Sequence, residues 1–125
     1  MSYPADLKYT KEHEWIRVDG NTGTIGITDF AQQQLGDVVY VELPDVGSTI
    51  TAGQVFGTIE SVKAVSELFA PVTGEVVETN ASLKDRPDHV NSKPHETWMV
   101  KVKLSNSGEI ASLMNAAAYE QLIQK

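Results

Sequence analysis

One lysine, Lys63, lies midway between two short runs that are rich in β-branched residues, and this arrangement constrains the fold more than any other feature. The runs cover residues 54–60 and 65–69, and small or polar residues adjoin the lysine on both sides. Two such runs joined by a few residues are typical of a β-hairpin. The pattern therefore predicts a tight hairpin that presents a single amine at its tip.

Further short β segments near 48–51 and 73–79 flank this hairpin, with turn signals at Gly53 and Pro71. Several short strands separated by regularly spaced turns predict a mainly β protein, built as a sandwich or barrel. Alternating residues over 98–104 predict one more half-buried strand. The polar segment 80–97 between these strands is expected to be a loop with at most a helical turn.

Both ends of the chain add helical patterns to this β core. Residues 13–27 predict a hairpin, followed by a short helix through 30–35 that Thr28 or Asp29 caps and Gly36 ends. Apolar residues then recur at helical spacing between about 108 and 123. We expect this C-terminal amphipathic helix to pack on the sheets of its own domain.

The size and composition indicate one acidic globular domain. The chain has 125 residues, which suits a single domain over 1–125. Its net charge is −7, from 17 acidic and 10 basic residues, which argues against binding to nucleic acid or to an anionic membrane. The charge favours steering toward basic partner surfaces, and we expect a monomer. The absence of cysteine excludes disulfides and thiolate nucleophiles.

No motif of an enzyme or of a targeting signal is found. The N-terminus lacks a basic region followed by an apolar stretch, and no apolar run approaches the ~20 residues of a membrane span. We therefore expect a cytoplasmic protein. The three histidines lack a metal-ligand spacing, and there is neither a phosphate-binding glycine loop nor a nucleophile elbow. These observations predict a non-catalytic protein without a metal.

The residues around Lys63 resemble the hairpin to which lipoate is attached in lipoyl domains, and nearly the whole chain resembles the glycine cleavage H-protein family. The lysine lies within Glu60-Ser61-Val62-Lys63-Ala64, and the match extends well beyond this motif. The resemblance rests on segments 13–15, 26–31, 35–44, 60–64, 71–80 and 116–119.

This resemblance implies a lipoyl-domain-like fold of two small antiparallel sheets, with a lipoyl-binding core of about 22–104. It implies that lipoate is the cofactor, linked through an amide to Nζ of Lys63. A lipoate ligase or a lipoyl or octanoyl transferase would attach it. We expect that enzyme to recognise Glu60, which flanks the tip, and Gly47 and Gly74, which bracket the hairpin.

The resemblance also implies three partner enzymes. A pyridoxal-phosphate glycine decarboxylase would load the arm with an aminomethyl group, a tetrahydrofolate-dependent aminomethyltransferase would remove it, and a flavin-dependent dihydrolipoyl dehydrogenase would reoxidise the arm. In this family the loaded arm folds back into a cleft, which Glu12, Glu14 and Glu67 are candidates to line. The alternative is that these three residues are solvated surface acids.

Other functions remain open on the sequence. A biotinyl domain shares the hairpin but is expected to have methionines beside the lysine, where Val62 and Ala64 stand. An H-like protein that serves mainly in lipoyl relay to other enzymes is a second alternative. It is kept because segment 91–98 departs from the family pattern: it is one residue shorter and lacks glycine. This difference leaves the conformation of that loop open.

Overall fold

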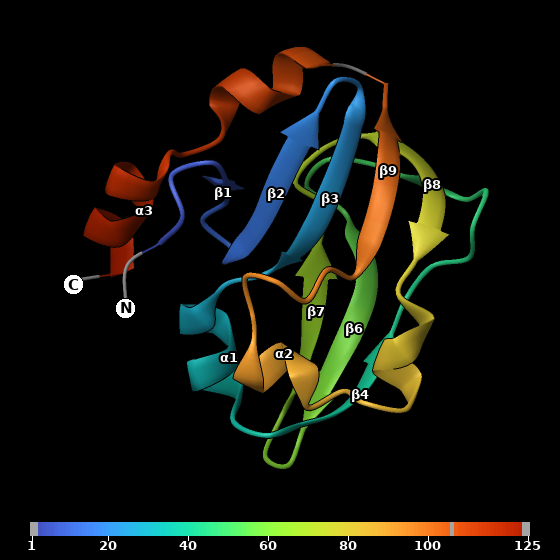
Figure 1. Cartoon of the computed structure of the whole chain (residues 1–125), viewed down its shortest axis with the longest axis vertical. Helices are drawn as coiled ribbons and strands as arrows, with labels where there is room; N and C mark the ends of the chain where they lie inside the picture. The colour runs from blue at the N-terminus through green and yellow to red at the C-terminus, as the bar shows by residue number, and fades with distance from the viewer. Residues whose placement is uncertain (1–2, 106, 124–125) are drawn as a thin grey trace.

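The computed structural model describes residues 3–105 and 107–123 as two antiparallel sheets with short helices at their margins (Figure 1). The elements in chain order are β1 (Lys8–Tyr9), β2 (Glu14–Asp19), β3 (Thr22–Ile27), α1 (Asp29–Leu35), β4 (Val38–Glu42), β5 (Thr49–Ile50), β6 (Val55–Ser61), β7 (Val65–Phe69), β8 (Gly74–Thr79), η1 (Ala81–Lys84), α2 (His89–Ser92), β9 (Val100–Leu104), η2 (Ser107–Ser112) and α3 (Ala116–Ile123).

The two sheets confirm the predicted fold class. One sheet has six strands in the order β1-β2-β3-β9-β8-β5, and the other has three in the order β4-β6-β7. The predicted hairpins are present as β2–β3 and β6–β7. Segment 80–97 carries η1 and α2, so it contains two helical turns rather than one. Within the described residues, no helix is long and apolar enough to span a membrane.

The main core lies between the facing sides of the two sheets. Ile25 and Val102 from the larger sheet meet Ile59 and Leu68 from the smaller one, and all four are at most 3% exposed. Each fully buried aliphatic side chain contributes about 1.5–3 kcal/mol to folding. The alternation of buried and exposed residues along these strands is therefore what holds the two sheets face to face.

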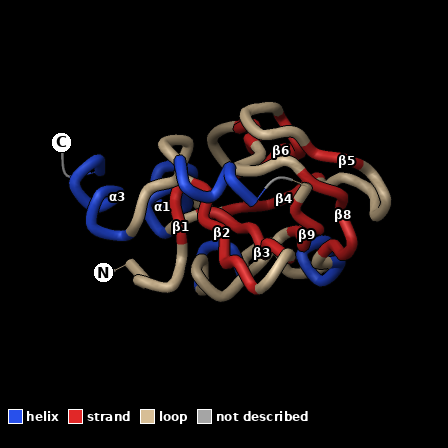
Figure 2. Tube along the Cα trace, turned by 90° about the horizontal axis from the view of Figure 1, so that it is seen from above, coloured by secondary structure: helices blue, strands red, loops and turns tan. Residues whose placement is uncertain are grey.

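A second, aromatic cluster attaches the C-terminal helix to the edge of the larger sheet. Leu7, Tyr9, Trp15 and Tyr119 are all fully buried in it, and the rings of Tyr9 and Tyr119 stack with centroids 4.8 Å apart. Seen from above, α3 lies outside the two sheets, beside β1 and α1 (Figure 2). The predicted packing of the terminal helix on its own domain is thus confirmed.

The prediction of one helix from about 108 to 123 is wrong in its extent. The segment forms the 3₁₀ helix η2 and then, after a break, the α-helix α3. Met114 lies in the break, where it exchanges two backbone hydrogen bonds of 2.8 and 2.9 Å with Tyr9. That pairing requires extended backbone, and Asn115 then caps α3 because its Oδ1 accepts a 2.9 Å hydrogen bond from the Ala118 N–H.

The short helix α1 begins and ends as predicted. The Thr28 hydroxyl accepts a hydrogen bond of 3.2 Å from the Ala31 N–H, and the Gly36 N–H closes the helix by donating to the Gln32 carbonyl at 3.0 Å. Cap and end signals are local, which is why the sequence suffices to find them.

Gly74 begins β8 at a point where the strand approaches its neighbour too closely for any side chain. A Cβ atom at this position would overlap the backbone carbonyl oxygen of Lys103 in β9. We therefore expect Gly74→Ala to lower the free energy of unfolding by about 1–3 kcal/mol, because the backbone must move. Urea unfolding would measure this loss. The exposed neighbour Glu75→Ala is the control, and equal stability of the two variants would contradict the interpretation.

Candidate functional site

Lys63 lies at the tip of the β6–β7 hairpin, at the bottom of the view in Figure 1. Ser61 closes the turn: its hydroxyl accepts hydrogen bonds from the N–H groups of Lys63 at 3.3 Å and Ala64 at 3.1 Å. Its own N–H donates to the Ala64 carbonyl at 2.8 Å. The turn thus satisfies the N–H groups of Ser61, Lys63 and Ala64 internally and leaves the lysine side chain exposed.

The segment between α1 and β4 braces this tip. The Val62 N–H donates to the Asp37 carbonyl at 3.0 Å. Asn91 fixes that segment in turn, because its side chain accepts from the Val38 N–H and donates to the Gly36 carbonyl, each at 2.8 Å. One hydrogen bond to Asp37, together with the pairing of Ser61 with Val38 between β6 and β4, therefore holds the tip against the segment that Asn91 fixes.

The Lys63 amine itself is available. Its Nζ forms no ion pair with the residues that the structure describes. Its Cε lies 3.4 Å from the position that a Cβ atom at Gly36 would occupy, so the side chain passes directly over that glycine. The absence of a side chain at Gly36 leaves room for the lysine stem beside α1.

A cavity of about 280 Å³ begins next to the tip, at Ala64. Its walls come from three segments: residues 12–14, the α1 residues Ala31, Gln34 and Leu35, and residues 64–68 along β7. Ile27 and Ile59 complete its apolar lining. The cavity thus runs from the lysine tip toward the start of β2.

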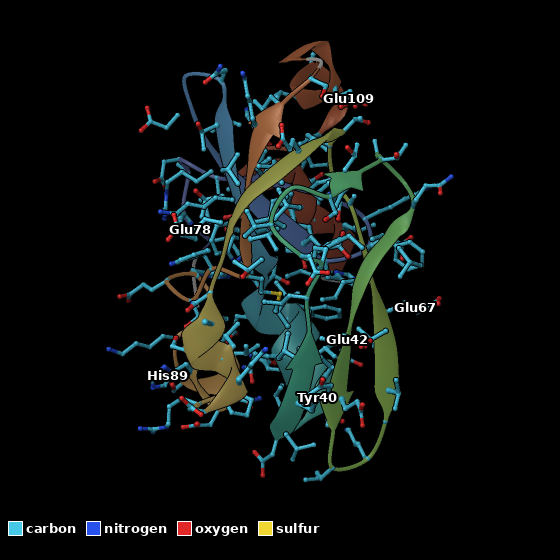
Figure 3. All side chains as sticks on the ribbon, turned by 90° about the vertical axis from the view of Figure 1, so that its right-hand side faces the viewer. Tyr40, Glu42, Glu67, Glu78, His89 and Glu109 are labelled. Carbon is cyan, nitrogen blue, oxygen red and sulfur yellow. The ribbon has the colours of Figure 1, made fainter. Side chains whose placement is uncertain are left out.

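The three carboxylates named from the sequence line this one cavity but differ in exposure. Glu14 is only 2% exposed, whereas Glu12 and Glu67 are solvent-exposed. Glu67 alternates along β7 with the buried Leu68, and Figure 3 shows it at the outer edge of the molecule. Glu14 is therefore the inner carboxyl of the cavity, and the other two belong to its rim.

Two donors hold Glu14. The Thr10 hydroxyl donates to Oε1 at 2.7 Å, and the Phe69 N–H donates to Oε2 at 3.0 Å. Burial nevertheless outweighs these hydrogen bonds and raises the pKa of Glu14 to about 7. Glu14 and Glu12 also line a second cavity of about 720 Å³, which extends toward Met114. The carboxyl between the two cavities can therefore gain or lose a proton near neutral pH.

Two residues at the site have no signal in the sequence. Thr10 orients Glu14, and Tyr119 in α3 forms a 2.8 Å hydrogen bond with His13 Nδ1. His13 is half-buried, its ring lies between those of Phe30 and Tyr119, and it also lines the cavity. Tyr119 belongs to segment 116–119 of the family resemblance, but nothing in the sequence indicated what its hydroxyl would contact.

The residues expected to be recognised by a modifying enzyme lie in two places. Glu60 is the second-last residue of β6, the strand that enters the tip, and it pairs with Tyr40 and Val65 across the sheet. Gly47 adopts a positive φ of 96° and donates its N–H to the Val76 carbonyl at 2.7 Å. It therefore belongs with Gly74 to the β8 region, whose start lies at the opposite end of the molecule from the tip (Figure 1). That a lipoate-attaching enzyme recognises these three residues stays a prediction. Each glycine also has a structural reason: Gly47 adopts a positive φ, and Gly74 lies too close to the Lys103 carbonyl for a side chain.

The glycine-free segment 91–98 has a defined conformation. Besides the contacts of Asn91, the Pro94 carbonyl accepts a hydrogen bond of 2.9 Å from the Trp15 indole, and His95 Nε2 accepts one of 3.1 Å from the Asp29 N–H. Burial lowers the pKa of His95, which favours this neutral acceptor form. The segment therefore supports α1 rather than forming an open loop. Among residues 3–105 and 107–123, no cluster of His, Asp and Glu is arranged to hold a metal ion.

The raised pKa of Glu14 predicts a specific dependence of stability on pH. Since the pKa is about 7 in the folded state and 4.5 ordinarily, the folded protein binds more protons than the unfolded chain between these values. The free energy of unfolding therefore falls as the pH rises through this window. Relative to that of Glu14→Gln, the free energy of unfolding of the wild type should fall by roughly 3 kcal/mol between about pH 4 and about pH 8.

Urea unfolding at a series of pH values would measure this difference. The exposed Glu12→Gln is the matched control, for which no such change relative to wild type is expected. A difference between wild type and Glu14→Gln that stays constant with pH would contradict the assignment of a protonated, buried carboxyl.

Comparisons with known proteins agree with this geometry. The family model described as glycine cleavage H-protein matches residues 7–125. A glycine cleavage system H protein from Koribacter versatilis is 60% identical over 121 residues, which cover 97% of this chain and 94% of that protein. Another from Brevibacillus brevis is 55% identical over 126 residues and matches 100% of both chains.

A solved structure shows the same fold. The crystal structure of a glycine cleavage system H protein from Mycobacterium marinum matches with a TM-score of 0.90 at 35% sequence identity. The match covers 98% of this chain and 100% of that one. On sequence and structure alike, the chain belongs to the glycine cleavage H-protein family.

Proposed function

We propose that this protein is the lipoyl carrier of a glycine cleavage system, with lipoate linked through an amide to Nζ of Lys63. One observation carries the proposal: an exposed lysine at a braced hairpin tip adjoins a cavity that ends in a buried carboxyl. The relatives named as H proteins of that system match the chain over nearly its full length.

The cavity suits an acyl arm that bears an amine at its far end. It begins at Ala64, beside the lysine, and its walls include the apolar side chains of Leu35, Ile59 and Leu68. Its volume of about 280 Å³ is close to the lower limit for sites that hold small organic ligands. Glu14 then offers a carboxyl at the inner end. When bound to Lys63, lipoate would supply the dithiolane sulfurs that take up the aminomethyl group of glycine.

The protein's own residues would present and shelter this arm. Ser61 and Asp37 hold the tip in place, so that a partner enzyme meets Lys63 in a fixed position. The apolar walls would reduce the contact of a bound arm with water. The Glu14 carboxyl can release its proton to pair with an arriving ammonium group, since its pKa of about 7 lies near neutral pH. The protein thereby acts as a carrier and needs no catalytic group of its own.

The surface beside the tip suits transient partners. Glu42 and Glu67 lie on either side of Thr58 in one cross-strand row, and Glu60 lies in the next row toward the tip. With a net charge of −7, this face would be steered toward basic surfaces and would release them quickly. The proposed partners are the glycine decarboxylase, the aminomethyltransferase, dihydrolipoyl dehydrogenase and the enzyme that attaches lipoate. The cytoplasmic location stays a prediction.

Replacement of the carrier lysine tests the proposal directly. Incubation with lipoate, ATP and a lipoate ligase should add the mass of one lipoyl group to the wild type and none to Lys63→Arg. The guanidinium of arginine keeps the charge but cannot form the amide. Circular dichroism should show an unchanged fold, because Lys63 is exposed and makes no ion pair with a described residue.

The function of the modified protein is then tested with purified partner enzymes. Lipoylated wild type should support release of carbon dioxide from glycine, and Lys63→Arg should not. Modification of the arginine variant, or glycine cleavage by it, would refute the assignment of Lys63. Modification of the wild type without glycine cleavage would instead favour a role in lipoyl relay.

A narrower cavity should weaken protection of the carried amine from water without affecting attachment of lipoate to Lys63. Ala31→Leu adds bulk to one wall without touching Lys63. We expect normal attachment of lipoate. The carried amine should be lost to water about tenfold faster or more, which corresponds to a loss of about 1.4 kcal/mol in the free energy that holds the arm in the cavity. Release of ammonia over time would measure this. Ala118→Leu on the exposed face of α3 is the control, and equal release rates from both variants would contradict the role of the cavity.

A further inference from the structure

One hydroxyl group, that of Tyr119, joins two of the segments that wall the cavity. Tyr119 is fully buried in α3, and its oxygen lies 2.8 Å from His13 Nδ1 and 2.7 Å from Thr28 Oγ1. A phenol can donate one hydrogen bond and accept another, so both contacts can exist together. Burial raises the pKa of Tyr119, which keeps the hydroxyl protonated.

The first of these contacts holds a strained turn. His13 adopts a positive φ of 71°, a conformation that costs a non-glycine residue energy and needs support from its surroundings. Its carbonyl accepts a 3.1 Å hydrogen bond from the Thr28 N–H, and its ring packs 4.7 Å from the Phe30 ring. Because His13 lies between Glu12 and Glu14, its conformation sets where both carboxylates point. The contact with Tyr119 therefore acts on the carboxylate wall.

The second contact holds the helical wall. Thr28 is fully buried and caps α1 by accepting a hydrogen bond from the Ala31 N–H. The α1 residues Ala31, Gln34 and Leu35 line the cavity. A hydroxyl that binds Thr28 therefore fixes the start of this wall relative to the His13 turn.

We propose that Tyr119 is a positioning residue, whose hydroxyl sets the spacing between the Glu12–Glu14 wall and the α1 wall and so determines how well the cavity encloses the arm. The C-terminal helix, which contributes no residue to the 280 Å³ cavity, thereby controls its shape. The role in enclosing an arm rests on the proposed carrier function, whereas the effect on the walls is a property of the unmodified protein.

The neighbouring tyrosine provides a matched control. Tyr9 is as fully buried as Tyr119 and stacks on it, but its hydroxyl donates to the Pro4 carbonyl at 2.7 Å, away from both walls. Tyr9→Phe and Tyr119→Phe each remove one hydrogen-bonded hydroxyl from the same aromatic cluster. If the Tyr119 hydroxyl only stabilised the fold, the two substitutions would have similar effects on the two walls of the cavity.

Hydrogen exchange on the unmodified protein provides the first test. The Ala31 N–H, which donates to Thr28, and the Phe69 N–H, which donates to Glu14, report on the two walls. After correction for global stability, Tyr119→Phe should speed their exchange by about threefold to tenfold, the factor expected from one lost hydrogen bond. Tyr9→Phe should leave both rates unchanged. Equal effects of the two variants would overturn the proposal.

The second test uses the lipoylated and loaded protein. Both variants should accept lipoate at Lys63 to the same extent, whereas Tyr119→Phe should release the carried amine about threefold to tenfold faster than Tyr9→Phe. Equal release rates would overturn the role of Tyr119 in enclosing the arm. If the wild type accepted no lipoate, the carrier function would fail, and the exchange rates would still decide whether Tyr119 positions the walls.

A second variant keeps the proposal testable if Tyr119→Phe does not fold. His13→Gly removes the side chain that contacts Tyr119 and tolerates a positive φ, because glycine has no Cβ atom to disfavour that conformation. It should speed exchange at the Phe69 N–H by about threefold to tenfold. Unchanged exchange in this variant would refute the inference for the carboxylate wall.

Discussion

A single hydrogen-bonded carboxyl connects the two sheets at the point where the site is built. Glu14 belongs to β2 of the larger sheet, and its Oε2 accepts a hydrogen bond of 3.0 Å from Phe69 at the end of β7 in the smaller sheet. Because β7 is an edge strand, this contact satisfies a backbone donor that no other strand pairs with. Among the described residues, no buried side-chain polar atom lacks a partner. The cost of burying Glu14 is thereby limited, and the β6–β7 hairpin is fixed relative to β2.

The site exposes Lys63 to other proteins at one place and offers a cavity for its attached arm at another. The tip around Lys63 is exposed and is held from one side by Asp37, so an enzyme can approach it from the other side. The cavity lies behind the tip and is lined by α1, by β7 and by the turn at His13. A carrier needs both properties, since its cargo must be accessible to each partner and protected between encounters. The fold meets these needs with one hairpin whose tip projects and whose flank forms a wall.

The sequence predicted the elements that depend on local signals. The Lys63 hairpin follows from two β-branched runs, and α1 follows from its cap at Thr28. The sequence did not predict the break at Met114, because the pairing of that residue with Tyr9 joins positions far apart in the chain. The grouping of three acidic residues around one cavity came from the family resemblance, but their unequal burial did not. Whether Glu14 lies in the core or on the surface depends on how two sheets meet, which no short pattern encodes.

The position of the arm in solution tests the central claim most directly. Backbone amide chemical shifts of the lipoylated protein would be compared before and after loading by glycine decarboxylase and glycine. If the loaded arm lies in the cavity, the shift changes should concentrate at residues 12–14, along α1 and along β7, with Glu14 and Phe69 among the largest. Changes confined to residues 62–64 would show that the arm stays in solvent and would contradict the account.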